Sequence, residues 1–363
     1  FFLLYFSFTP GDHPRLFFGE YKVSDLRAKL DEEPFQSMYQ SLLFQLQIGS
    51  FADWYNPNEV YDVSLKAFIH GFLYLLTNDE SHAQEARSLV ETVLANTQNA
   101  WADPGTKGLA LYWMATRVAV TYDWCVSSEA WDESFSYTVS SELLKAAEVI
   151  LNDGGSQQNS AVGSNWQGAR GASGGLALLA TDHVYGNELA DAAWGRVERY
   201  IQDAFGGSGW LSEGTGYFYF PVANYVGPYG IALARRNPDR DLRDFPAFRN
   251  GYWAAVASNV ANTRPEGWPA VQTDWSDDNP HTGGEGVYGQ AFYYLPEELR
   301  RPYKHAYDVT QGTQSPFYQE AVYDDGLWDA YRGGTLWSYL YYPSEKTGMP
   351  PEESYAWHER MKD

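Results

Sequence analysis

The chain has one cysteine, no long hydrophobic run and no linker-like tract. Cys125 alone cannot form an internal disulfide, and its apolar, aromatic neighbours predict a buried small side chain rather than a nucleophile. No hydrophobic run reaches the roughly 18 residues of a membrane span. No Ser/Gly-rich or low-complexity stretch divides the 363 residues. We therefore expect no membrane span and one main domain over residues 21–345, with residues 1–20 as an N-terminal extension and residues 346–363 as a C-terminal tail.

Basic residues are also scarce. The 25 Lys and Arg are outnumbered by 47 Asp and Glu, which gives a net charge of −22. This balance argues against nucleic acid or an anionic membrane as a partner, because neither offers a cation to meet it. It also opposes an anionic polysaccharide, unless the basic residues gather in the binding site while carboxylates cover the outside.

Aromatic residues are abundant by contrast. They make up 17% of the chain, with 14 Trp and 28 Tyr. Their flat apolar faces and polar tips suit stacking on sugar rings. For any single aromatic, a place in the core or on the surface is the commoner explanation.

Helical periodicity dominates the sequence, and Gly or Pro falls between the periodic segments. Ser24 is the expected N-cap of a helix over residues 25–30. The pattern predicts an all-α fold of paired antiparallel helices closed into a ring, although periodicity does not separate such a toroid from an open helical array. The sequence has no repeat of constant period, which argues against a regular solenoid. The other predicted helices cover residues 35–48, 64–77, 81–97, 107–125, 133–151, 168–181, 186–204, 219–236, 245–260 and 329–341.

Two polar segments carry the side chains best suited to catalysis. Residues 164–167 (Ser-Asn-Trp-Gln) open a Gly/Ala-rich stretch, and residues 213–219 (Glu-Gly-Thr-Gly-Tyr-Phe-Tyr) follow a Gly-rich turn. The amide of Asn165 can bind a carboxylate, and the phenol of Tyr217 can transfer a proton. Splitting a uronic-acid polymer by β-elimination needs these two groups. Helix capping is the alternative role of Asn165.

The order of several motifs is similar to that in the heparinase II/III and alginate lyase superfamily. These are residues 13–18 (His-Pro-Arg-Leu-Phe-Phe) before a helix, a helix end at residues 120–124, the Asn165 segment, and Glu213-Gly214 followed by Tyr217. The resemblance covers residues 13–230. It implies an incomplete (α/α) toroid, often followed by a β-sandwich for which this chain has no room. We expect a toroid-only lyase or a fragment ending after the toroid.

The resemblance also implies catalytic roles. Asn165 matches the residue that neutralises the uronate carboxylate, and Tyr217 matches the tyrosine that takes the C5 proton and can return one to O4. A phenol with a pKa of about 10 needs nearby cations or a concerted step. Tyr219, Tyr225 and Tyr229 are plausible substitutes. Each could equally be an ordinary helix aromatic.

The chain departs from these relatives at two histidine positions. Many of them have His after the neutralising Asn, where this chain has Trp166, a ring suited to stacking. His281 is the best candidate for a later histidine, in an acidic loop that also holds Trp275. Asp274, Asp277 and Asp278 with His281 could bind a divalent cation, but the spacing matches no standard calcium loop. We favour a solvated turn and expect no metal or cofactor.

Further candidates for substrate binding are basic or polar. Arg suits this task because its planar fork engages carboxylates in bidentate fashion. An ordinary surface charge is the alternative for each basic residue. These candidates are Gln167, Arg170, Lys107, Arg117 and Arg264.

We therefore expect a lyase acting on an unsulfated uronan, alginate first and glucuronan second, since no basic cluster suits sulfate. The substrate implies a secreted or periplasmic protein, although residues 1–6 lack the basic flank of a signal peptide. One alternative is a toroid hydrolase of uronyl oligosaccharides using Asp123, Glu213 and Asp274. Another is a carbohydrate-binding protein without turnover.

Overall fold

Helices account for all the regular elements in the part of the chain that the structure describes. The computed structural model describes residues 13–47, 58–102, 108–152, 161–181, 188–214, 218–260, 285–310, 334–350 and 353–354. Within these ranges no strand forms, and the antiparallel pairing of Phe205 with Leu211 is an isolated bridge. The predicted all-α class is confirmed.

No helix in the described ranges is both long enough and apolar enough to cross a membrane.

The α-helices are α1 (Glu20–Ala28), α2 (Phe35–Gln45), α3 (Asn58–Thr77), α4 (Glu80–Ala102), α5 (Gly108–Cys125), α6 (Glu133–Asn152), α7 (Asn165–Ala180), α8 (Glu188–Ala204), α9 (Gly227–Arg236), α10 (Pro246–Val260), α11 (Glu285–Tyr294), α12 (Glu297–Thr310) and α13 (Gly334–Tyr341). A π-helix, η3 (Phe218–Val226), precedes α9, and a 3₁₀ turn, η4 (Leu242–Asp244), follows it.

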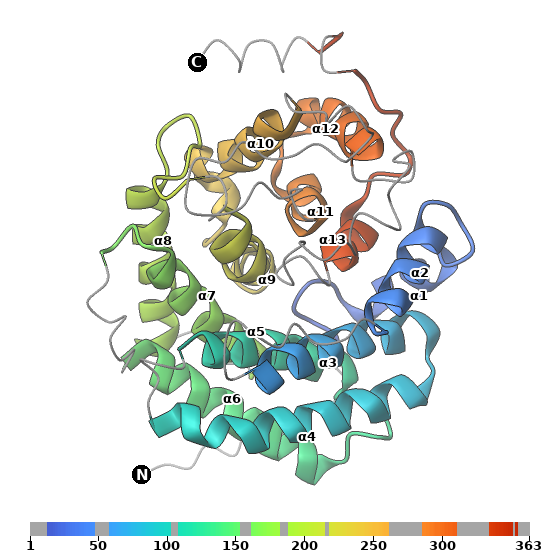
Figure 1. Cartoon of the computed structure of the whole chain (residues 1–363), viewed down its shortest axis with the longest axis vertical. Helices are drawn as coiled ribbons and strands as arrows, with labels where there is room; N and C mark the ends of the chain where they lie inside the picture. Colours follow the sequence, from blue (N-terminus) through green and yellow to red (C-terminus); the bar gives the residue numbers. More distant parts are fainter. Residues whose placement is uncertain are drawn as a thin grey trace.

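The helices form an inner and an outer set (Figure 1). Helices α3, α5, α7, α9, α11 and α13 lie toward the middle of the molecule, and α4, α6, α8, α10 and α12 lie at its periphery. Helix α3 packs against α4 and α5, and α7 packs against α5, α6 and α8. Helix α11 packs against α10 and α13, and α13 packs against α2. The last described helix therefore returns to the first part of the chain.

Most of the predicted helices form, with shifted ends. Helix α7 begins at Asn165, three residues before the predicted start. The prediction for Ser24 is wrong, because α1 begins after Gly19 and Ser24 lies within it. Residues 219–236 divide into η3 and α9 instead of forming one helix. Helices α11 and α12 were not predicted, and Pro302 within α12 is a residue type that normally marks a helix end.

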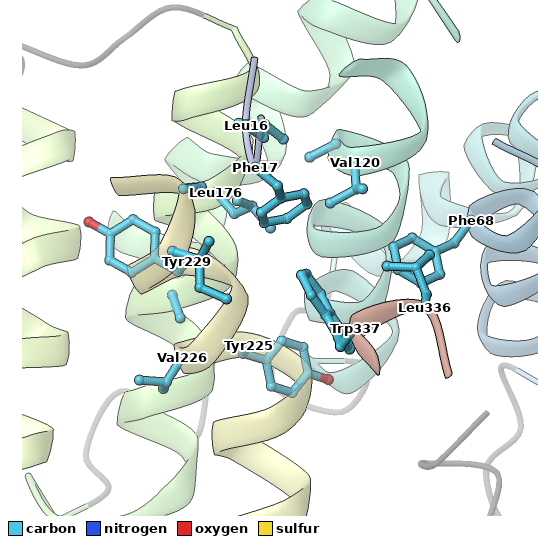
Figure 2. Close-up of a cluster of buried hydrophobic side chains, with 14 of the residues drawn as sticks. Leu16, Phe17, Phe68, Val120, Leu176, Tyr225, Val226, Tyr229, Leu336 and Trp337 are labelled. Carbon is cyan, nitrogen blue, oxygen red and sulfur yellow. The ribbon is translucent and has the colours of Figure 1, made fainter. Parts of the chain in front are cut away.

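The residues before α1 are built into the core. Figure 2 shows Phe17 among Val120 of α5, Leu176 of α7 and Trp337 of α13. The rings of Phe17 and Trp337 meet edge to face with centroids 4.9 Å apart. Residues 13–18 are all buried. This part of the predicted N-terminal extension therefore packs into the helical body.

The residues after 345 also contact the helical body. The backbone N–H of Met349 donates to the carbonyl of Arg301 in α12 over 3.1 Å. Lys346 pairs with Glu297 at the start of the same helix. The described part of the predicted C-terminal tail is therefore docked on α12.

A buried carboxylate on α5 holds the segment before α1. Asp123 is fully buried, and its Oδ1 lies 2.7 Å from His13 Nδ1. The backbone N–H groups of Arg15 and Leu16 each donate to this carboxylate over 3.0 Å. The Arg15 guanidinium in turn donates to Ala180 O at the end of α7 over 2.8 Å. Asp123 thus connects this segment to α5, and Arg15 connects it to α7.

We predict that Asp123→Asn lowers the free energy of unfolding by about 3 kcal/mol, because an amide group would place a donor against donors that now meet a charged acceptor. Urea unfolding followed by circular dichroism would measure this change. Asp203→Asn, at an exposed carboxylate on α8, is the control and should stay within about 0.5 kcal/mol of the wild type. Equal effects of the two substitutions would contradict the structural role of Asp123.

Candidate functional site

The candidate site begins at the first turn of α7. Ser164 is the N-cap of this helix, and its side-chain oxygen accepts from the backbone N–H of Trp166 over 3.4 Å. Asn165 is the first helical residue. The capping role considered for Asn165 thus belongs to Ser164, and the Asn165 amide makes a different contact.

Asn165 is held by Glu213 through two hydrogen bonds. The backbone N–H of Asn165 donates to Oε2 of Glu213 over 2.6 Å, and its side-chain Nδ2 donates to Oε1 over 3.2 Å. A carboxylate at a helix N-terminus is also favoured by the helix dipole. The two polar segments singled out in the sequence are therefore in direct contact, although the sequence did not predict this pair.

The loop after α8 brings Glu213 to this position. The backbone N–H of Ser212 donates to Ala204 O over 2.7 Å, and that of Gly206 donates to Trp210 O over 2.9 Å. Gly214, directly after Glu213, has φ +97°, a conformation that favours glycine. A tight turn fixed to the end of α8 therefore sets where the carboxylate lies.

The π-helix η3 follows the Glu213 turn. Helices of this type are rare and often occur at functional sites. Pro221 within η3 has no N–H to donate, which disfavours a regular α-helix here. Tyr225 of η3 is fully buried, with its ring 4.9 Å from that of Trp113. In this structure Tyr225 is thus a core aromatic, with no exposed surface for a sugar.

Two aromatic rings of α5, those of Tyr112 and Trp113, lie close to residues that the sequence predicted for substrate binding. Trp166 is partly buried, and its ring meets that of Tyr112 with centroids 6.1 Å apart. Burial raises the pKa of Tyr112 to about 12, so this phenol is neutral at ordinary pH. The guanidinium of Arg117 lies 4.0 Å from the centre of the Trp113 ring. The sequence did not single out Tyr112 or Trp113, because they lie within a long apolar helix.

One of the predicted substrate-binding residues, Arg170, contacts the C-terminal end of a neighbouring helix, and another, Gln167, contacts Arg196. Arg170 is 0% exposed, and its guanidinium donates to Ile150 O and, over 3.2 Å, to Leu151 O near the end of α6. Arg196 donates to Leu151 O over 3.0 Å and to Gln167 Oε1 over 3.2 Å. Cations favour the unsatisfied carbonyls at a helix C-terminus. We therefore leave Arg170 out of the proposed site and regard Gln167 as a partner of Arg196.

The remaining candidates fall outside the described residues. The side chain of Tyr219 is also outside the description, although its backbone lies in η3. Among the described residues, no group of three or more His, Cys, Asp and Glu is placed to hold a metal ion. The candidates outside the described ranges are Tyr217, His281, Lys107, Trp275, Arg264 and the whole acidic loop with Asp274, Asp277 and Asp278.

Comparison with protein-family models finds no match to this chain, and comparison with curated proteins also finds none. Function must therefore be inferred from the residues and their contacts.

Close packing of α8 fixes the surroundings of Asn165. A Cβ at Gly168 would lie 2.7 Å from ring carbons of Tyr200, which is closer than real contacts allow. Burial raises the pKa of the Tyr200 phenol, and the nearby carboxylate of Glu213 raises it further. A neutral aromatic ring from α8 thus lies against the first turns of α7, beside the Asn165–Glu213 pair.

We predict that Gly168→Ala lowers the free energy of unfolding by about 1–3 kcal/mol through overpacking against Tyr200. Gly195→Ala on α8 is the matched control, because a Cβ there meets only the end of the flexible Arg199 side chain at 3.4 Å. The free energy of unfolding of this control should rise by up to about 1 kcal/mol, because alanine has a higher helix propensity than glycine. Urea unfolding of both variants would test the difference. A stabilised Gly168→Ala variant would contradict the close contact.

Proposed function

We propose that this protein is a polysaccharide lyase that cleaves an unsulfated uronan by β-elimination, and that its helices form an incomplete (α/α) toroid. The inner and outer sets of helices, and the return of α13 to α2, support the toroid. The order of motifs over residues 13–230 supports the lyase. Alginate is the first choice of substrate and glucuronan the second.

The contact between Asn165 and Glu213 is the observation that carries the proposal. Nδ2 of Asn165 has two N–H groups, and Glu213 accepts one of them. The other can donate to the carboxylate of a uronate. Removal of the C5 proton drives negative charge into that carboxylate, so a fixed donor stabilises the transition state more than the ground state.

Tyr217 is proposed as the proton carrier. Its phenolate takes the proton from C5, the C4–O4 bond breaks, and a C4–C5 double bond forms. In syn elimination the resulting phenol then returns a proton to O4 of the leaving sugar. No water and no cofactor is consumed. His281 is proposed as a further member of the site on the resemblance alone, and a secreted or periplasmic location follows from the proposed substrate.

The contacts of two carboxylates favour elimination over hydrolysis. A hydrolase needs one carboxyl group as an acid and another as a base or nucleophile. The carboxylate of Asp123 is fully buried and accepts from backbone N–H groups of the segment before α1. Glu213 uses both of its oxygens to hold Asn165. Neither carboxylate is therefore placed as a hydrolytic acid or base.

The first test of this function concerns the product. We expect incubation with alginate or glucuronan to release oligosaccharides with a C4–C5 double bond, because elimination adds no water. Ultraviolet absorbance of the conjugated product and mass spectrometry would detect it. Saturated products that carry an added water would instead favour the hydrolase. Binding without any product would favour a carbohydrate-binding protein.

The second test concerns the proposed catalytic pair. We expect Asn165→Ala to lower kcat roughly 100- to 1,000-fold, the usual cost of losing one preorganised donor. Tyr217→Phe deletes only a hydroxyl and should abolish turnover while keeping substrate binding. Tyr137→Phe, at an exposed ring on α6, is the matched control and should keep full turnover.

Initial rates on the uronan that the wild type cleaves would provide these values. If Tyr217→Phe stays active while Tyr219→Phe is inactive, the tyrosine has been assigned to the wrong position. If Asn165→Ala keeps its turnover, the proposed role of Asn165 is wrong.

A further inference from the structure

Glu213 contacts both the main chain and the side chain of Asn165. Both of its carboxylate oxygens accept from one residue, Asn165. We propose that Glu213 is a positioning residue that fixes the Asn165 amide in the orientation needed to neutralise a uronate carboxylate. This role rests on the proposed lyase function.

The two contacts restrict the amide in a specific way. Oε2 of Glu213 lies 2.6 Å from the backbone nitrogen of Asn165, and Oε1 lies 3.2 Å from Nδ2. The carboxylate thus bridges the main chain and the side chain of the same residue. A flip of the Asn165 amide would turn Oδ1 toward Oε1 and place two acceptors against each other. The direction of the second N–H of Nδ2 is therefore set before any substrate binds.

The surroundings of Glu213 keep this bridge in place. The turn that carries Glu213 is bonded to the end of α8 through Ser212 and Ala204. Asn165 itself is only 6% exposed, so little water competes for its amide. A donor that is fixed in advance needs no reorganisation as charge develops, which is the condition for strong transition-state stabilisation.

If Glu213 were only a cap of α7, its substitution would lower stability without lowering kcat. Glu213 and Ser164 both accept from backbone N–H groups at the start of α7, but only Glu213 also contacts the Asn165 side chain. Ser164→Ala is therefore a matched control for the loss of a cap. Glu213→Gln has nearly the same shape as Glu213, but its single oxygen can accept at only one of the two positions.

The experiment measures kcat, KM and the free energy of unfolding for these variants on the uronan that the wild type cleaves. We expect Glu213→Gln to lower kcat roughly 10- to 100-fold, with little change in KM, because a hydrogen bond to a charged group is lost where charge develops. Ser164→Ala should lose stability but keep its kcat. In the Asn165→Ala background, Glu213→Gln should cause no further loss of kcat, because it acts through Asn165.

Three outcomes would overturn the role of Glu213. Glu213→Gln could keep the wild-type kcat. Ser164→Ala could lower kcat by the same factor as Glu213→Gln. Glu213→Gln could lower kcat by the same factor in the Asn165→Ala background as in the wild type. If Glu213→Gln does not fold, Glu213→Asp replaces it, since its shorter side chain cannot reach both donors and the same loss of kcat is expected. A wild type inactive on every uronan would overturn the lyase function and this role together. An active wild type with an unaffected Glu213→Gln would overturn this role alone.

Discussion

Close packing around α7 is the constraint on which the inner set of helices depends. Nearly every residue of this helix is buried, so neighbours press against it from several sides. Tyr200 of α8 lies where Gly168 has no side chain, and the ring of Tyr229 from α9 lies where Gly175 has none. Because these positions lack a Cβ, helices on two sides can approach the same backbone. The position of Asn165 follows from that packing.

Three arginines of the described chain contact the C-terminal ends of helices in the same way. Arg27 donates to Leu75 O near the end of α3, Arg15 to Ala180 O at the end of α7, and Arg170 to carbonyls near the end of α6. Each cation thus satisfies carbonyls that a helix leaves without partners. These three arginines stabilise the fold, and in the proposed lyase the donor to the substrate carboxylate is the neutral amide of Asn165.

Local patterns allowed the helical class and most helices to be predicted, because apolar periodicity reports which face of a segment is buried. The same patterns failed where contacts with distant parts of the chain decide where a helix begins or whether it forms. Gly19 rather than Ser24 precedes α1, and α12 contains a proline. Asn165 was found by its chemistry, but its contact with Glu213 lies 48 residues away in sequence. That distance is closed by the length of α8 and its tight turn, which no local pattern reveals.

The burial of residues 13–18 bears on how the chain is made. Phe17 lies against Trp337, and Arg15 accepts at its carbonyl from Arg235 of α9 over 3.0 Å. A ribosome completes this early segment long before α9 and α13 exist. Contacts between such distant parts of a chain form slowly, since a long loop must close first. During synthesis the apolar side chains of this segment are therefore not fully covered until α13 has been made.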